Sequence, residues 1–258
     1  MSGPGRVGDV IRLRARRRKR SRKLSQNVRG PDPSRLRFEA GDTAAHAKRP
    51  ISRTFERFNA DLAGRPQLIK GKSQILFGGM SRLSEGSLVV THNKSYSLTA
   101  EIEVPASGAN GVIVALGGGG GGFSLYALNG KLKHCYNFFG IQRYFAEGTQ
   151  PIPVGRHQVR MEFKYDGGGL AKGGAVSLFV DGKKVGDGRV DQTVPMLFSA
   201  DETCDVGKET GSTVSPDYGP SNNEFSGGVN WVQIDLEKDD HDHLITPEER
   251  FRIAMARE

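Results

Sequence analysis

The residues that anchor a chain in a membrane or cross-link a small secreted domain are scarce in this sequence. Two cysteines, Cys135 and Cys204, occur among 258 residues, which is too few for a disulfide scaffold. They either pair with each other or remain free, buried thiols. No run of 18 apolar residues occurs, so we expect no membrane-spanning helix. The first 30 residues carry cations but no apolar segment, so we expect no secretory signal, and a location that is cytoplasmic or unassigned.

Positive charge is concentrated at one end of the chain. Residues 1–50 contain 15 lysines and arginines against 4 acidic residues, whereas the whole chain carries a net charge of +8. The remainder is therefore slightly acidic, and its composition gives no general reason to expect nucleic-acid binding.

The segment "RLRARRRKRSRK" (12–23) has nine cations in twelve positions. Like charges at this density repel each other, and apolar residues to bury are missing, so we expect residues 1–50 to form a disordered basic tail. Such a tail either binds polyanions or anionic membranes, or is an extension without function that follows a start codon placed too far upstream. No aromatic residue lies between the cations, so base stacking by the tail is not expected.

Residues 74–258 are expected to form a β domain. Side chains alternate between the two faces of a strand, so a period of two indicates half-buried strands. This pattern occurs in "SYSLTAEIEV" (95–104), "QVRMEFKY" (158–165), "AVSLFV" (175–180) and "VNWVQIDL" (229–236). Asn129-Gly130 and Asp181-Gly182 lie between strand-like segments and suit tight hairpin turns. Short, regularly spaced strands of this kind predict an antiparallel β-sandwich or jelly roll.

Two helices are predicted outside the strands. "SRTFERFNADLAG" (52–64) brings Phe55, Phe58 and Leu62 to one face, within a helix and linker at 51–73. "TPEERFRIAMARE" (246–258) begins with a capping box, because Thr246 suits the N-cap and a glutamate follows three residues later. The predicted β-sandwich therefore ends in a short C-terminal helix.

Six consecutive glycines, residues 117–122, satisfy the spacing of a dinucleotide-binding loop. That loop needs a helix directly after it, because the helix N-terminus holds the pyrophosphate. Here the next residues are "FSLYALNGKLKHCYN", which predict a strand, an Asn-Gly turn and another strand. We therefore interpret the glycines as a flexible hairpin turn.

A long polar segment from Ser199 to Trp231 interrupts the strand pattern. Loops of this length inside a domain are usually functional or disordered. Its acidic residues match no defined calcium-loop spacing, so we interpret the segment as a docking loop for another domain. The residues that we expect to carry docking are Asp201, Glu202, Asp205, Asp217 and Tyr218. We expect Trp231 to be a core residue, and we read "DDHDH" (239–243) as a solvated approach to the C-terminal helix rather than as a metal site.

Several phrases of the sequence resemble the C-terminal region of long bacterial arylsulfatases. The resemblance covers residues 52–258, nearly all of the sequence expected to fold. In such relatives the middle of the glycine loop usually carries larger residues. The glycines at this place in the present sequence depart from that pattern, which should loosen the turn. The phrases are "ERFNADLAGRPQLIKG", "NKSYSLTAEIEVP", "NGVIVALGG", "HQVRMEFKYDGGGLAKGGAVSLFVDGKKVG", "FSADETCDVGKETGSTVSPDYGP", "NWVQIDL" and "DHLITPEERFRIAMARE".

The resemblance implies an accessory role. Sulfatases hydrolyse sulfate esters with a formylglycine made from Cys or Ser in a C/S-x-P-x-R motif, beside a calcium-type divalent ion, and both belong to an N-terminal α/β domain that is missing here. "PDPSR" (31–35) has the shape of the motif, but Pro31 offers no thiol or hydroxyl at the nucleophile position. Cys135 and Cys204 lack the motif's proline and arginine. We therefore expect a truncated or detached C-terminal domain with no catalytic residue, metal or cofactor of its own, and a sulfatase catalytic domain as its partner.

Two other functions remain open at this point. The predicted sandwich resembles concanavalin A-like and laminin G-like lectin folds, which makes a carbohydrate-binding module the alternative. Exposed aromatic side chains at Tyr136, Phe138, Phe139 or Tyr218 would favour it, because sugars stack on aromatic rings. The third function is polyanion binding by the basic tail, the one expected route to nucleic acid.

Overall fold

The computed structural model describes residues 69, 71–199 and 201–236. These residues contain twelve strands and one short 3-10 turn, η2 (Glu85–Ser87). The strands are β1 (Ser73–Phe77), β2 (Leu83–Ser84), β3 (Tyr96–Val104), β4 (Gly111–Gly118), β5 (Gly121–Leu128), β6 (Lys131–Phe138), β7 (Gln142–Pro151), β8 (Gly155–Tyr165), β9 (Gly174–Val180), β10 (Lys183–Val190), β11 (Thr203–Val206) and β12 (Gly228–Leu236).

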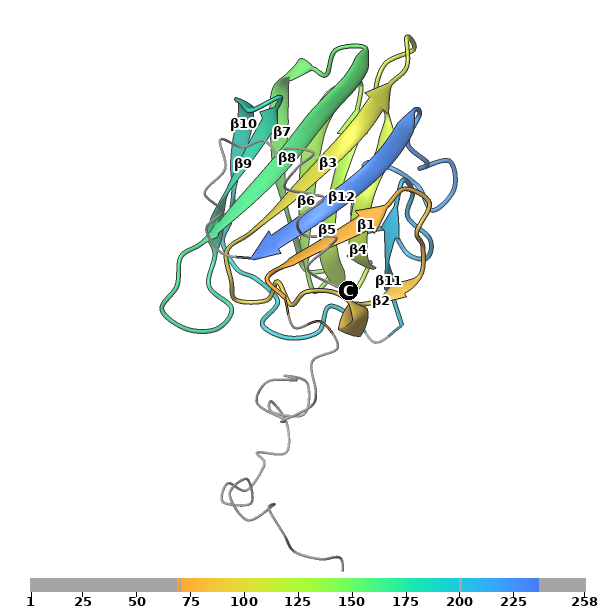
Figure 1. Ribbon diagram of the computed structural model, residues 1–258. Helices are drawn as coiled ribbons and strands as arrows, with labels where there is room; N and C mark the ends of the chain where they lie inside the picture. Colours follow the sequence, from red (N-terminus) through yellow and green to blue (C-terminus); the bar gives the residue numbers. More distant parts are fainter. Residues whose placement is uncertain (1–68, 70, 200, 237–258) are drawn as a thin grey trace, which may run out of the picture. The chain divides into compact units, whose positions relative to one another are not determined.

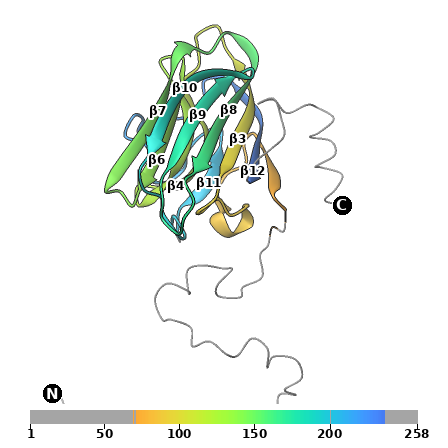
Figure 2. The same cartoon turned by 90° about the vertical axis from the view of Figure 1, so that its left-hand side faces the viewer.

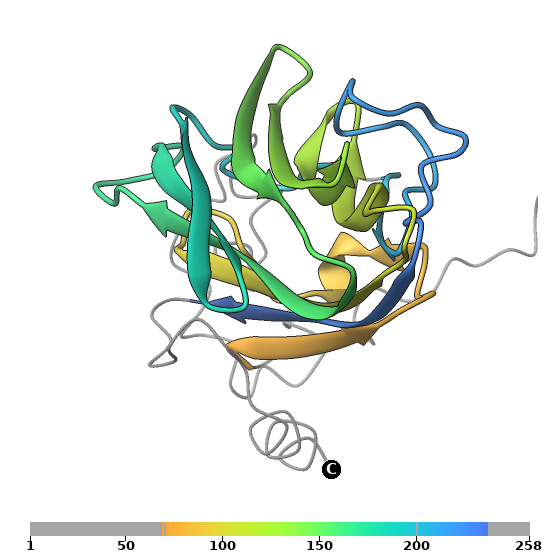
Figure 3. The same cartoon turned by 90° about the horizontal axis from the view of Figure 1, so that it is seen from above.

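All twelve strands belong to one antiparallel sheet that curls until its two halves face each other. The order is β1-β12-β3-β8-β9-β10-β7-β6-β5-β4-β11-β2. Figure 1 shows β1, β12, β3 and β8 in one layer, with β4, β5 and β6 behind them, and Figure 2 shows β8, β9, β10 and β7 side by side where the sheet curls. The two layers meet at β10 and β7, where Gly188 pairs with Ala146. The curl is clearest from above in Figure 3. The predicted antiparallel sandwich of jelly-roll type is therefore confirmed.

The inward face of β3 follows the predicted alternation. Leu98, Ala100 and Ile102 are completely buried, as expected for side chains that point between the layers. The outward face differs from the prediction, because Ser97 and Thr99 are buried rather than solvated. One reason is the neighbouring strand β8, where Arg160 donates a hydrogen bond from its guanidinium to Oγ1 of Thr99 at 2.6 Å. Polar pairing between neighbouring strands thus replaces water on part of this face.

Aromatic rings fill one end of the space between the layers. Tyr96 of β3 packs against Phe123 of β5 and Phe163 of β8, with ring centroids 5.6 and 5.4 Å apart. Phe198, in the connection before β11, meets Phe123 edge to face. Tyr136 of β6 is buried beside them, and its hydroxyl accepts a hydrogen bond from the Val194 backbone at 2.9 Å. Strands from both layers are therefore joined by one aromatic cluster.

The predicted hairpin turns are confirmed. Asn129-Gly130 and Asp181-Gly182 have positive φ at both residues, as a type I′ turn requires. The glycine run also forms a hairpin, since Gly118 at the end of β4 pairs with Gly121 at the start of β5. The interpretation of these glycines as a turn that leads into a strand, with no helix after it, is confirmed. Trp231 is 3% exposed, which confirms that it is a buried residue.

Several predicted features lie outside the described residues. They are the basic tail (1–50), the helix at 52–64, the "DDHDH" segment and the C-terminal helix at 246–258. Among the residues that are described, no helix is long and apolar enough to cross a membrane.

A buried histidine makes part of the fold sensitive to acid. His134 of β6 is 1% exposed and lies between Leu125 and Ala146 on the inward face. Neither ring nitrogen has a hydrogen-bond partner among the described residues. Burial lowers the pKa of His134 to about 3, because the charged ring would be desolvated without compensation.

We expect the substitution His134→Leu to reduce the loss of stability in acid. The unfolded chain takes up a proton at this residue below about pH 6.5, whereas the folded chain takes it up only near the lowered pKa. Its contribution to the free energy of unfolding is therefore complete above pH 6.5 and falls by about 2 kcal/mol between pH 6.5 and pH 5. Urea unfolding at pH 7 and pH 5, followed by Trp231 fluorescence, measures this difference. Identical pH dependence in the wild type and the variant would contradict the prediction.

Candidate functional site

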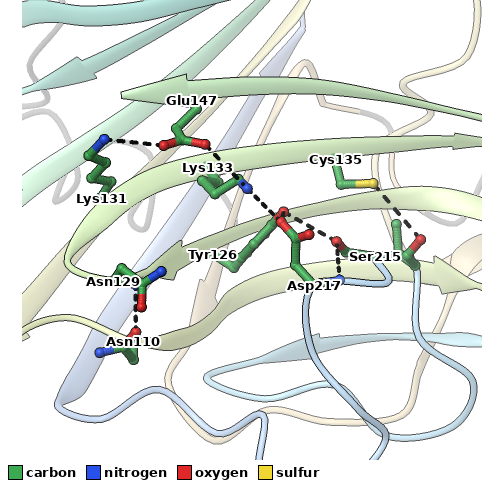
Figure 4. A network of polar contacts seen from close by, with 10 residues as sticks. Asn110, Tyr126, Asn129, Lys131, Lys133, Cys135, Glu147, Ser215 and Asp217 are labelled. Carbon is green, nitrogen blue, oxygen red and sulfur yellow. Dashed lines mark hydrogen bonds and ion pairs between the residues drawn. The ribbon is translucent and has the colours of Figure 1, made fainter. Parts of the chain in front are cut away.

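The segment predicted to be a docking loop contains a strand. Between Ser199 and Trp231, residues 203–206 form β11, which pairs with β4 and β2. The irregular part is residues 207–227, which we call the covering loop. Side chains and backbone of this loop contact β5 and β6 on the outward face of the back layer, as the following contacts show (Figure 4).

Asp217 anchors the covering loop to the back layer. Its Oδ2 accepts a hydrogen bond from the Tyr126 hydroxyl at 2.6 Å and lies 2.6 Å from Nζ of Lys133. Ser215 also donates to the Tyr126 hydroxyl, at 3.2 Å, and Glu147 of β7 lies 3.3 Å from the same Lys133 nitrogen. Figure 4 shows these groups directed toward one another from β5, β6, β7 and the loop. The predicted loop residue thus forms an internal, charge-assisted network.

The ionisation of Asp217 follows from these contacts. Partial burial works to raise its pKa, but the hydrogen bonds from Lys133 and Tyr126 outweigh it and hold the pKa below the ordinary value. The carboxylate therefore stays charged at neutral pH, and Lys133 remains its cationic partner.

A second set of contacts fixes the shape of the covering loop itself. Asn223 exchanges two hydrogen bonds of 3.0 Å with the backbone of Glu209. The Glu209 carboxylate accepts from the Val214 amide at 2.9 Å, and Tyr218 donates from its hydroxyl to Ser124 of β5 at 2.7 Å. Burial raises the pKa of Glu209 to about 7, although the Tyr218 hydroxyl and the Val214 amide oppose the rise.

The remaining predicted residues hold the start of the segment. Asp205 is buried, and its carboxylate accepts hydrogen bonds from the Arg82 amide and from both donors of Thr210. Glu202 accepts from the Ser212 hydroxyl, at 2.5 Å. Asp201 is exposed. Four of the five residues predicted for docking therefore have internal partners, and docking to another domain stays a prediction.

Lys133 and Tyr126 belong to this network and were not expected from the sequence. Each occupies an outward position in a regular strand, where a polar residue normally faces water. Their acidic partner is Asp217, and Tyr126 is 91 positions before it in the sequence. No local pattern links residues so far apart.

The cysteines and aromatic residues are mostly covered. Cys135 and Cys204 are free, buried thiols. Burial raises the pKa of Cys135 to about 12 and raises that of Cys204 as well, so both thiols are protonated at neutral pH. Of the four aromatic residues considered for a sugar platform, Tyr136 is 2% exposed, Tyr218 and Phe138 are partly buried, and Phe139 is 42% exposed.

A separate cleft of about 180 Å³ lies where β1 and β11 end and β12 begins. We call it the glycine cleft. Among the described residues, no cluster of three or more His, Cys, Asp and Glu side chains is placed to hold a metal ion, here or elsewhere. The cleft is lined by Gly78, Gly79, Val206, Gly207, Lys208, Glu224, Phe225, Gly227 and Val229.

We expect Asp217→Asn to loosen the covering loop. The amide keeps the shape of the side chain but removes the charge that pairs with Lys133, so the free energy of unfolding should fall by about 1–3 kcal/mol. Hydrogen exchange of peptides from residues 207–227 should become faster. Asp201→Asn is the matched control, since this exposed acid should change neither quantity. Equal exchange in the two variants would show that Asp217 does not anchor the loop.

Comparisons with known proteins identify no family. No family model matches the chain, and no curated protein matches it. Among solved structures, domains LG4-5 of the mouse laminin alpha1 chain are 18% identical over 64% of this chain and 42% of their own length, with a TM-score of 0.36. Domain 4 of an arabinanase from Geobacillus stearothermophilus, in complex with arabinotriose, is 15% identical over 70% of this chain and 87% of its own, with a TM-score of 0.37. The galectin LEC-6 of Caenorhabditis elegans is 13% identical over 64% of this chain and 96% of its own, with a TM-score of 0.34.

Proposed function

We propose that the chain is a non-catalytic accessory domain of an arylsulfatase-like protein and that it packs against a sulfatase catalytic domain. The most direct support is that the side chains with potential reactivity already have structural roles in the fold. Asp217, Lys133 and Asp205 hold the covering loop in place, and the thiols of Cys135 and Cys204 are buried and protonated. These groups stabilise the fold and leave no activated nucleophile among them.

The placement of the sequence phrases agrees with this proposal. The phrase at residues 198–220 forms β11 and most of the covering loop. The phrase at 157–186 forms most of β8, all of β9 and the start of β10, and the phrase at 230–236 forms most of β12. The resemblance therefore rests on residues that build the sandwich and its cover, as expected for a supporting domain.

Activity and thiol measurements test the absence of catalysis. The purified protein, incubated with an aryl sulfate and calcium, should give no turnover above a blank without protein. Iodoacetamide should label Cys135 and Cys204 only after unfolding, because the thiolate is the reactive form. Turnover, or an aldehyde at either cysteine detected by mass spectrometry, would refute the proposal.

The accessory role has its own test. A sulfatase catalytic domain prepared without its C-terminal region should co-elute with this chain in size-exclusion chromatography. Separate elution at micromolar concentrations of both proteins would count against packing between them, whatever the activity assay gives.

Carbohydrate binding is the second candidate, and the glycine cleft is the observation that favours it. A flat aromatic platform has little support, because Tyr136 is buried and only Phe139 of the four aromatic residues is well exposed. The cleft instead combines one cation and one carboxylate with exposed glycine backbone and the partly buried side chain of Val229. Small-ligand sites are concave and use a few polar groups to fix the orientation of the ligand.

A glycan array tests this candidate directly. If the chain is a carbohydrate-binding module, the labelled full-length protein should bind a defined subset of glycans, and removal of calcium should leave binding intact because the cleft contains no metal cluster among the described residues. Silence across the array, with and without calcium, would exclude the candidate.

A further inference from the structure

Four of the nine residues that line the glycine cleft are glycines, and hydrogen bonds hold the backbone around them in place. Gly79 donates to the Val206 carbonyl at 3.3 Å, and Val206 donates to the Met80 carbonyl at 2.8 Å. On the other side, Phe225 donates to the Gly207 carbonyl at 2.8 Å. The wall is therefore formed before any ligand arrives, which reduces the entropy cost of binding.

Two of the glycines keep the cleft open. Gly79 and Gly207 have φ of +82° and +88°, values that other residues rarely adopt. A Cβ added at Gly79 would meet no atom within 4 Å, and one at Gly207 would only just touch Val229. Neither glycine has a side chain that could fill the space beside it, so the interior of the cleft stays accessible.

Two charged side chains line the cleft without an internal partner. Lys208 and Glu224 are exposed, and neither has an ion pair or side-chain hydrogen bond to another residue of the described ranges. This distinguishes Glu224 from Asp205 of β11 and from Asp217, another acid of the covering loop, which have internal partners. One donor and one acceptor of opposite charge remain available to a ligand, and together they carry no net charge.

The size and the lining limit what fits. A volume of about 180 Å³ is below the roughly 300–1,000 Å³ of sites for drug-sized ligands, so a single small ring fits better than a chain. Of the apolar lining residues, Val206 and Phe225 are buried, and the partly buried Val229 offers apolar surface to the C–H face of such a ring.

We propose that the glycine cleft binds one neutral sugar ring, with Glu224 accepting hydrogen bonds from its hydroxyl groups and Lys208 donating to them. This assignment rests on the proposed carbohydrate-binding function and gives that function a site. The balance of one cation and one carboxylate disfavours an anionic ligand such as a sulfated sugar. A zwitterionic amino acid would match both charges, but exposed ion pairs contribute little in water, whereas a sugar ring offers several hydroxyl groups to the two side chains and also contacts Val229.

Saturation-transfer NMR of the full-length chain with glucose, galactose, mannose and arabinose tests the site. At least one of these sugars should receive saturation from the wild type. Glu224→Gln and Lys208→Met should each raise the dissociation constant roughly tenfold, because each removes a charge-assisted hydrogen bond. Lys184→Met with Asp187→Asn is the matched control, since this exposed pair on β10 should leave binding unchanged. Trp231 emission verifies that each variant is folded.

The outcomes separate the site from the function. If a sugar binds and the Glu224 and Lys208 variants bind it equally well, the cleft is not the site, while carbohydrate binding stands. If none of the four sugars binds and a glycan array is also silent, both proposals fail. Displacement of a bound sugar by glycine at equal concentration would reassign the cleft to a zwitterion and overturn the proposal.

Discussion

The contact between Asp217 and the back layer of the sandwich is the constraint on which the described site depends. Its carboxylate meets Tyr126 and Lys133, which lie on neighbouring strands. Removal of either partner would leave a partly buried charge or hydroxyl unsatisfied, so the three groups are stable only together. The covering loop that they hold shields Cys135, and its two ends supply Lys208 and Glu224 to the glycine cleft. The contacts of Asp217 on the back layer therefore hold the loop whose two ends carry Lys208 and Glu224 to the glycine cleft.

Most of the fold could be predicted from the sequence, because its signals are local. The inward residues of β3 and β8 and the turn at Asn129-Gly130 depend on neighbouring residues only, and they are found in the structure. The outward face of β3 differs, because Ser97 and Thr99 are buried there. β11 was not predicted, since it is four residues long and lies within a polar segment. The contacts of Lys133 with Asp217 could not be predicted either, because they join residues that are distant in sequence and depend on how the chain returns over the sheet.

The candidate site illustrates the same limit in a different way. The acidic residues of the long segment suggested docking, because carboxylates bind metals and partners. In the structure, Asp205 accepts hydrogen bonds from the Arg82 amide and from Thr210, and Glu202 accepts one from the Ser212 hydroxyl. Composition identifies which chemical groups are present but not which of them already have partners. The cleft was missed for the opposite reason, since glycines such as Gly79 and Gly207 reveal an opening only when their surroundings are known.

Two buried titratable groups affect the pH dependence of stability in opposite directions. Burial disfavours the charged form of each group, which lowers the pKa of His134 to about 3 and raises that of Glu209 to about 7. As the pH falls through the acidic range, His134 becomes protonated in the unfolded chain but not in the folded chain, so the free energy of unfolding decreases. Glu209 becomes protonated at a higher pH in the folded chain than in the unfolded chain, so its contribution to the free energy of unfolding increases over the same range. Between the ordinary pKa values of the two side chains these effects partly cancel. A free energy of unfolding that changes little with pH in this range would therefore reflect two buried groups with opposite effects rather than an absence of buried ionisable groups.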